Sequence, residues 1–179
     1  DRQGRLLSQI DAQGNTTSYE YTDAGKLVKM TDAQGNVQNY TVDGNGFNTS
    51  ESDWLGNTTT SERNAQNQVT KITDPLGNAT TYSYDDRGNM TVATDANGHS
   101  TTYTYDAVGN VSTETNAKGV TTSYVYDANY NLTSLTDAAG TSTYLYDAMD
   151  RVVGQTDRRG NTQWFRYDAI GRVTAVRDK

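Results

Sequence analysis

Tyrosines and aliphatic residues recur along the chain in two alternating kinds of short segment. In the seven-residue kind, such as His99–Tyr105, two tyrosines stand at positions i and i+2, here Tyr103 and Tyr105. Because successive side chains of a strand point to opposite faces, these two tyrosines share one face of a sheet. The six-residue kind, such as Asn89–Thr94, is also of ordinary strand length. The pattern therefore predicts a chain made of short β-strands with a ladder of tyrosines along one face.

The six-residue segments tend to carry their apolar residues three positions apart, as in Leu27 and Met30 or Leu132 and Leu135. Simple alternation would place such residues on opposite faces of the sheet. A β-bulge next to the preceding turn would bring them back to one face and bend the strand. One bulge in each repeat would then curve the whole sheet.

The two segments together form a repeat of 21 residues, with one step of 20. The recurring glycines are Gly14, Gly35, Gly56, Gly77, Gly98, Gly119, Gly140 and Gly160. The recurring tyrosines are Tyr21, Tyr84, Tyr105, Tyr126, Tyr146 and Tyr167, with Val42 and Arg63 in the two remaining slots. One such unit buries too little apolar surface to fold alone, so neighbouring units must stabilise one another. The sequence predicts an all-β fold, an antiparallel meander of β-hairpins, in which residues 1–179 form a single array of about eight and a half repeats.

The pattern Asp-x-x-Gly marks the turns between strands. An aspartate at the first turn position can accept a hydrogen bond from the backbone two residues on, and glycine at the fourth position adopts a positive φ at little cost. Asn67 and Asp150 replace this glycine and also tolerate the left-handed region. Tyr130 stands in the same position, where we expect strain of about 1 kcal/mol or more unless that turn differs.

Composition restricts the possible chemistry. The chain contains no cysteine, which excludes disulfides and thiolate metal sites. Its net charge of −7 argues against a nucleic-acid surface, and no apolar run is long enough for membrane insertion. Residues 150–179 are nevertheless rich in arginine, which indicates either solvated strand faces or a docking edge for an acidic segment. The chain starts and stops within a repeat, so we expect it to be a fragment of a longer protein.

The elements "YDAxGN" at Tyr105–Asn110 and "YDAxGR" at Tyr167–Arg172, preceded by "TTYxYD", resemble the RHS or YD repeats. These occur in bacterial RHS polymorphic toxins, in the C components of insecticidal toxin complexes, in wall-associated toxins and in animal teneurins. The resemblance implies a curved sheet that forms part of a spiral hollow shell, with an enclosed C-terminal toxin in the bacterial members and an adhesive role in teneurins. The residues assigned to the structural repeat are Tyr82, Tyr84, Asp85, Gly88, Tyr103, Tyr105, Asp106, Gly109, Tyr124, Tyr126, Asp127, Tyr146, Asp147, Tyr167, Asp168 and Gly171.

A shell segment that encapsulates and delivers a toxin is therefore the function that we expect, in a protein that is secreted or at the cell surface. Its partners would be neighbouring repeats of the same chain and an enclosed toxin domain, and no cofactor is expected. Unpaired strands at the ends of the fragment could also support edge-to-edge self-association.

Catalysis has little support in the sequence. His99 is the only histidine and follows a turn glycine, which favours a surface position over a catalytic base. Asp85 and Asp86 are adjacent, which is not the facing arrangement of glycosidase carboxylates. The segment Thr73–Asn78 superficially resembles the family's Asp-Pro-x-Gly cleavage element, but it is in register with the ordinary turns. The Asp-rich turns lack the pattern of the known calcium loops. We expect no enzyme and no metal site.

The main alternative is an adhesive or carbohydrate-binding module, in which aromatic and amide side chains bind sugars. Trp54 lies in a turn and is the expected exposed glycan contact. Trp164 precedes Phe165, which occupies a slot of the aromatic ladder, and we expect Trp164 to be structural or sheet-facing.

Overall fold

A computed structural model describes residues 1–178 as antiparallel β-strands joined by turns, with no helix in that range. The chain divides into two compact units, unit 1 from Asp1 to Tyr82 and unit 2 from Ser83 onward. The strands of unit 1 are β1 (Ser8–Ile10), β2 (Thr16–Tyr21), β3 (Leu27–Thr31), β4 (Val37–Val42), β5 (Asn48–Ser52), β6 (Thr58–Arg63) and β7 (Val69–Thr73); β8 (Ala79–Tyr84) crosses the boundary. Those of unit 2 are β9 (Met90–Thr94), β10 (Ser100–Tyr105), β11 (Val111–Thr115), β12 (Thr121–Tyr126), β13 (Leu132–Asp137), β14 (Gly140–Tyr146), β15 (Val152–Thr156), β16 (Thr162–Tyr167) and β17 (Val173–Asp178).

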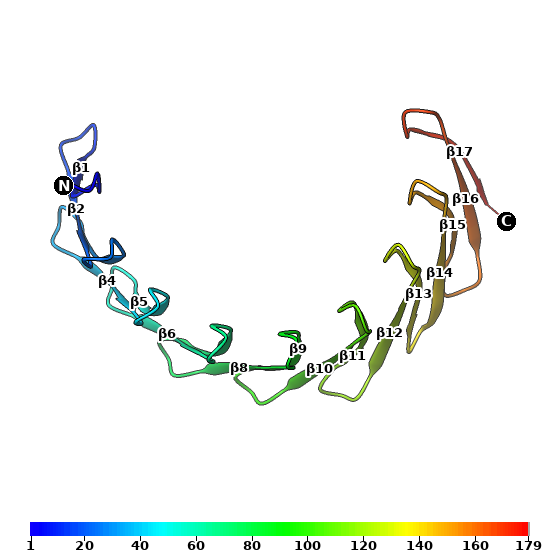
Figure 1. The fold of residues 1–179 in the computed structure, drawn as a ribbon, viewed down its shortest axis with the longest axis horizontal. Coiled ribbons are helices and arrows are strands. Elements are labelled where there is room, and N and C mark those ends of the chain that lie inside the picture. Colours follow the sequence, from blue (N-terminus) through cyan, green and yellow to red (C-terminus); the bar gives the residue numbers. More distant parts are fainter. Residues whose placement is uncertain (179) are drawn as a thin grey trace. The chain divides into compact units, whose positions relative to one another are not determined.

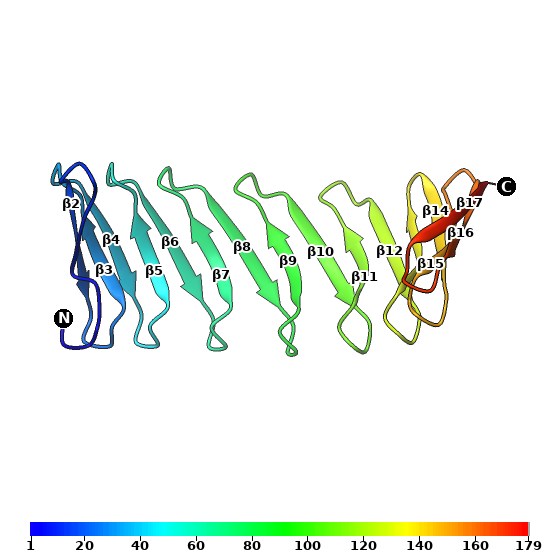
Figure 2. The same cartoon turned by 90° about the horizontal axis from the view of Figure 1, so that it is seen from above.

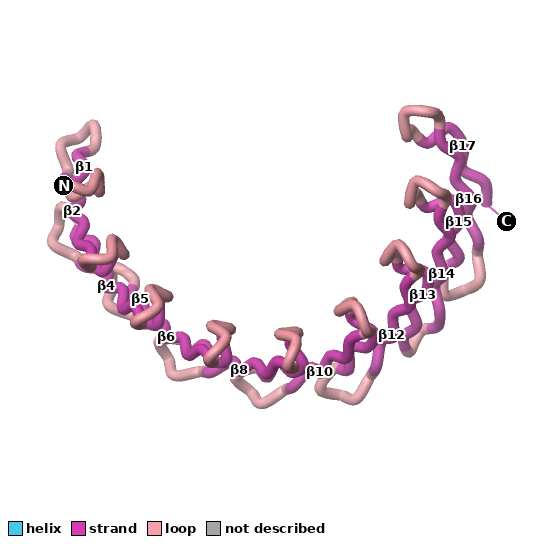
Figure 3. Tube along the Cα trace, viewed as in Figure 1, coloured by secondary structure: helices cyan, strands magenta, loops and turns pink. Residues whose placement is uncertain are grey.

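Each unit is a meander in which every strand pairs antiparallel with the next one in the sequence, from β1 to β8 in unit 1 and from β9 to β17 in unit 2. Within each unit the strands lie side by side in a single curved layer (Figure 1, Figure 2). The turns project at both edges of that layer (Figure 3). The predicted all-β class and hairpin meander are therefore confirmed.

Because the sheet is a single layer, the described residues contain no fully buried apolar side chain. Among residues 1–178, only Ser52 and Gly154 are buried. The Ser52 hydroxyl accepts a hydrogen bond of 2.8 Å from the backbone N–H of Asn39. Stability must come from contacts along the layer, between successive repeats.

The predicted bulges are present, one in each hairpin that follows a tyrosine strand of the described pairings. Between β2 and β3 the register shifts so that Tyr21 faces Leu27 while Tyr19 faces Met30. The apolar residues three apart thus both face tyrosines. The same shift follows Thr41, Glu62, Thr104, Val125, Leu145 and Arg166. The alternate hairpins have no shift, so the bulges lie at one edge of each unit's sheet, where they bend successive strands.

Most turns follow the predicted geometry, as at Asp106. Its backbone N–H donates to the Asn110 carbonyl at 2.9 Å, and the Gly109 N–H donates to the Asp106 carbonyl at 3.3 Å. The carboxylate accepts the predicted bond from the N–H of Val108, two residues on, at 2.9 Å. Asn110 adds a bond from its side-chain Nδ2 to the second carboxylate oxygen, at 2.9 Å.

The turns at Tyr130 and at Gly140 need separate description. Tyr130 has a φ of 67° and keeps the ordinary turn hydrogen bonds to Asp127, so the expected strain is present in an unchanged turn. At the 20-residue step, Asp137 pairs directly with Gly140, which leaves a tight two-residue loop. This shorter loop accounts for the repeat being one residue shorter, and β14 still pairs with β13 in the same way as in the other hairpins.

Candidate functional site

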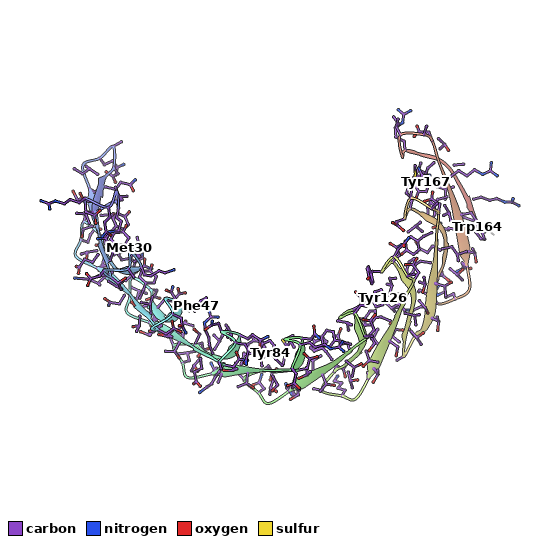
Figure 4. All side chains as sticks on the ribbon, in the orientation of Figure 1. Met30, Phe47, Tyr84, Tyr126, Trp164 and Tyr167 are labelled. Atoms are coloured by element: carbon purple, nitrogen blue, oxygen red, sulfur yellow. The ribbon has the colours of Figure 1, made fainter. Side chains whose placement is uncertain are left out.

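The candidate site is the row of tyrosines that runs across successive repeats. In the tyrosine strands, half-buried and exposed residues alternate, and the tyrosines are on the half-buried side. In unit 2, Tyr126 and Tyr167 lie on the concave side of the sheet and Trp164 on the convex side (Figure 4). In unit 1, Met30 and Phe47 also lie on the concave side (Figure 4). The tyrosines of these strands therefore share one face within each unit, and the assignment of the full set of repeat residues stays a prediction.

In four repeats the tyrosine that precedes the turn aspartate ties its repeat to the one before. The Tyr146 hydroxyl donates a hydrogen bond of 2.8 Å to the backbone carbonyl of Leu132, at the start of β13. Equivalent bonds join Tyr21 to Leu6 at 2.9 Å, Tyr105 to Met90 at 2.6 Å and Tyr167 to Val152 at 2.7 Å. Each acceptor belongs to the residue just after the preceding Tyr-Asp turn. The expected tyrosine ladder is therefore held by hydroxyl-to-carbonyl bonds as well as by ring packing.

The environment of these tyrosines favours the protonated hydroxyl. Burial raises the pKa of Tyr126, and the carboxylate of Asp106 in the preceding turn raises it further. Tyr105 and Tyr146 have raised pKa values for the same two reasons, with Asp85 and Asp127 as the neighbouring carboxylates. A neutral hydroxyl is the form that can donate to the carbonyl of the preceding repeat.

A second inter-repeat contact pairs an arginine with an aromatic ring. The guanidinium of Arg151, just after one Tyr-Asp turn, lies 4.6 Å from the ring centroid of Tyr167 in the next repeat. Arg5 makes the same contact with Tyr21 at 5.3 Å and also donates to the Thr22 carbonyl at 2.8 Å. Cation–π contacts of this kind add to the hydroxyl bonds between repeats.

In the repeat that lacks the usual tyrosine, the arginine and the aromatic residue have exchanged positions. Arg63 occupies a tyrosine slot, and Phe47 occupies the position that Arg5 and Arg151 hold elsewhere. The Arg63 guanidinium lies 5.0 Å from the Phe47 ring centroid and donates to the Asn67 carbonyl at 2.8 Å. Its buried Nε has no hydrogen-bond partner. The contact between repeats therefore survives the loss of the tyrosine, at the expense of one unsatisfied donor.

The turn aspartates are ionised anchors for the backbone. Hydrogen bonds to the carboxylate, above all from the Asn110 side chain, hold the pKa of Asp106 below its ordinary value. The same effect, with the partner four residues on as the largest cause, lowers the pKa values of Asp11, Asp32, Asp53, Asp74, Asp85, Asp95, Asp127, Asp147, Asp157 and Asp168.

The residues considered for catalysis or chain cleavage lie in ordinary turns. His99 is exposed and its Nδ1 lies 3.1 Å from the turn carboxylate of Asp95. Asp74 begins a turn with the usual bonds to Gly77 and Asn78, as expected for an ordinary turn. Among residues 1–178 no three acidic, histidine or cysteine side chains are grouped as metal ligands would be. No helix in that range could cross a membrane.

The two tryptophans differ in exposure from a simple division into an exposed Trp54 and a covered Trp164. Trp54 is half-buried, whereas 42% of the Trp164 surface is exposed. Trp164 lies on the convex face of unit 2, which no other layer of that unit covers. The assignment of Trp54 as a glycan contact stays a prediction.

Comparison with known proteins identifies the repeat. The RHS repeat family model matches residues 1–37, 63–100, 91–121, 105–142, 126–162 and 146–179. These matches cover most of the chain, and it belongs to the RHS repeat family. The unmatched residues 38–62 include Phe47, one partner of the exchanged pair. No curated protein matches the sequence.

Two solved structures share the fold. The crystal structure of TcdB2-TccC3-TEV matches all of this chain with a TM-score of 0.78 and 17% sequence identity, over 11% of its own length. The structure of the Photorhabdus luminescens Tc holotoxin pore with a mutated TccC3 matches all of this chain with a TM-score of 0.65 and 12% identity, over 14% of its length. At such identities the likeness concerns the fold, and the chain spans only a small part of these proteins.

Proposed function

We propose that this chain is a wall segment of an RHS-repeat toxin shell, which encapsulates a C-terminal toxin and delivers it. The observation that carries the proposal is the curved single layer of each unit: residues 1–178 contain no fully buried apolar side chain, and in unit 2 the hydroxyls of Tyr105, Tyr146 and Tyr167 tie successive repeats together. Such a layer lengthens by adding repeats and gains stability from each addition. These properties suit a container wall.

The family and the shared fold support this role. Both matched structures contain TccC3, one of them is a Tc holotoxin pore, and the chain covers a short stretch of each. We infer that residues 1–179 are one continuous array within a longer wall, whose partners are neighbouring repeats and an enclosed toxin domain. The protein would be secreted or at the cell surface, and this segment would need neither a cofactor nor catalytic residues.

Limited proteolysis of the native, full-length polypeptide tests the proposal. A non-repeating segment beyond the array should resist protease while the wall is folded and be digested once urea has unfolded it. The same segment, expressed alone, is the matched control and should be digested at once. Digestion at equal rates in the native polypeptide and in the isolated segment would contradict encapsulation.

An adhesive or glycan-binding module remains the second candidate, because the convex face of unit 2 exposes an aromatic side chain, Trp164. Binding of a glycan on an array, lost with Trp54→Ala, would favour that candidate in the form that the sequence predicts.

A further inference from the structure

One cross-strand pair of the array departs from all its equivalents. In the hairpins without a bulge, the corresponding pairs are Ser8–Ser18, Lys29–Asn39, Ser50–Thr60, Lys71–Thr81, Val92–Thr102, Thr113–Ser123 and Ser134–Thr143. In the last such hairpin, between β15 and β16, the pair is Gly154–Trp164. Tryptophan, the largest side chain, therefore stands opposite glycine, which has no side chain beyond a hydrogen atom.

Gly154 is needed for space and not for backbone conformation. It is absent from the residues with positive φ among residues 1–178. A Cβ atom at this position would lie 2.9 Å from Cζ3 and 3.1 Å from Cε3 of Trp164. The indole thus rests directly on the backbone of β15, while 42% of the Trp164 surface stays exposed.

Two arginines flank this indole on the same face. Arg177 is the cross-strand partner of Trp164 on β17, and Arg166 lies two residues further along β16. Neither forms an ion pair with another residue of the described chain. Trp164, Arg166 and Arg177, together with Val153, Phe165 and Ala175, line a half-open hollow of about 720 Å³. Leu145, which faces Gly154 from β14, is 54% exposed beside it.

Packing over a strand glycine explains why an indole is present at position 164, but it does not explain the two arginines beside it. An aromatic ring over glycine adds packing to a weak point of a sheet. That role needs no positive charge, whereas two unpaired guanidinium groups at the edge of an exposed ring create a local site for an anion in a chain of net charge −7.

We propose that Trp164, Arg166 and Arg177 form a binding site for an acidic oligosaccharide on the convex face of unit 2. The apolar C–H face of a pyranose ring would stack on the open face of the indole, as in other sites where an aromatic body meets a partly polar ligand. The guanidinium groups would bind the carboxylate or sulfate groups of the sugar through charge-assisted hydrogen bonds. A flat, open indole ring suits the apolar face of a sugar ring.

Titration with a heparin hexasaccharide tests the site, with maltohexaose as the neutral control. The chain carrying Trp54→Phe leaves Trp164 as the only tryptophan, so its fluorescence reports on the site directly. We expect the hexasaccharide to change this fluorescence saturably, with an affinity that falls as salt is added, and maltohexaose to bind at least tenfold more weakly. Equal affinity for maltohexaose, or binding without a change in Trp164 fluorescence, would overturn the proposal.

Matched variants separate this site from general charge attraction. The double variant Gly154→Ser with Trp164→Thr recreates the ordinary Ser134–Thr143 pair, so it should fold normally and bind the hexasaccharide at least tenfold more weakly when followed by calorimetry. Arg166→Gln should weaken binding severalfold, whereas Arg159→Gln, which removes an equal charge from a nearby turn, should have little effect. Unchanged binding in the folded double variant, equal losses from the two arginine variants, or equal competition by a polyglutamate peptide would each refute an acidic-sugar site.

Discussion

Removing a single tyrosine hydroxyl tests whether the ties between repeats stabilise the array. Tyr146→Phe keeps the ring and deletes only the oxygen that donates to the Leu132 carbonyl at 2.8 Å. A net intramolecular hydrogen bond contributes about 0.5–1.5 kcal/mol to the free energy of unfolding. Because the site is half-buried, the Leu132 carbonyl is only partly rehydrated when it loses this donor. We therefore expect a loss of about 1 kcal/mol.

The same deletion at Tyr105, which donates to the Met90 carbonyl, should cost a similar amount. Tyr105 and Tyr146 are separated by four strand spacings, roughly 19 Å, so the two losses should be additive to within about 0.5 kcal/mol. The double variant should thus lose about 2 kcal/mol.

Urea unfolding followed by circular dichroism at neutral pH measures these losses as shifts of the transition midpoint. Tyr130→Phe is the matched control, because it removes the same atom from a side chain that is 60% exposed. We expect its free energy of unfolding to stay within about 0.5 kcal/mol of the parent. The reasoning is refuted if Tyr146→Phe is as stable as the parent, or if Tyr130→Phe loses as much as Tyr146→Phe does.

Four further predictions follow from the turns and the inter-repeat contacts. Tyr130→Gly should raise the urea midpoint, by roughly 0.5–1 kcal/mol in stability, because it relieves the left-handed strain; an unchanged or lower midpoint would contradict this. In a double-mutant cycle, the single variants Phe47→Arg and Arg63→Tyr should each destabilise unit 1. The double variant should lose less stability than the sum of the two, with a coupling of about 0.5–1 kcal/mol; additive losses would disprove the exchanged contact. The pKa of Asp106 and its counterparts is lowered on folding, so their stabilisation is complete above pH 3.8 and should be lost as the pH falls below it, as a pH series of urea midpoints will show. The pKa of Tyr126 is raised on folding, so its contribution is complete below pH 10.0 and should be lost as the pH rises above that value, with an absorbance titration giving the order of ionisation.

The strands, turns and bulges could be predicted because they follow from local patterns. Leu27 and Met30 can share a face only if the strand is bulged, and the structure places them opposite Tyr21 and Tyr19. The Asp-x-x-Gly pattern likewise predicted the turn bonds at Asp106 through local stereochemistry.

The ties between repeats could not be predicted in the same way. The acceptor of the Tyr146 hydroxyl is 14 residues away in the sequence and becomes its neighbour only through the register of the β13–β14 hairpin. The exchange of Phe47 and Arg63 carries a signal, since the two residues occupy the positions of Arg5 and Tyr21 in another repeat, but its meaning needs the stacking geometry. The exposure of Trp164 depends on which face of the sheet is left uncovered, which the pattern of one strand does not specify.

Electron cryo-microscopy of the native, full-length polypeptide is the most direct test of the proposed wall. The account predicts that these repeats form one turn or part of a turn in a closed, single-layer β wall, with density for another segment of the polypeptide inside it. An array whose two faces are both open to solvent, or one packed against a second layer with nothing enclosed, would contradict the proposed container.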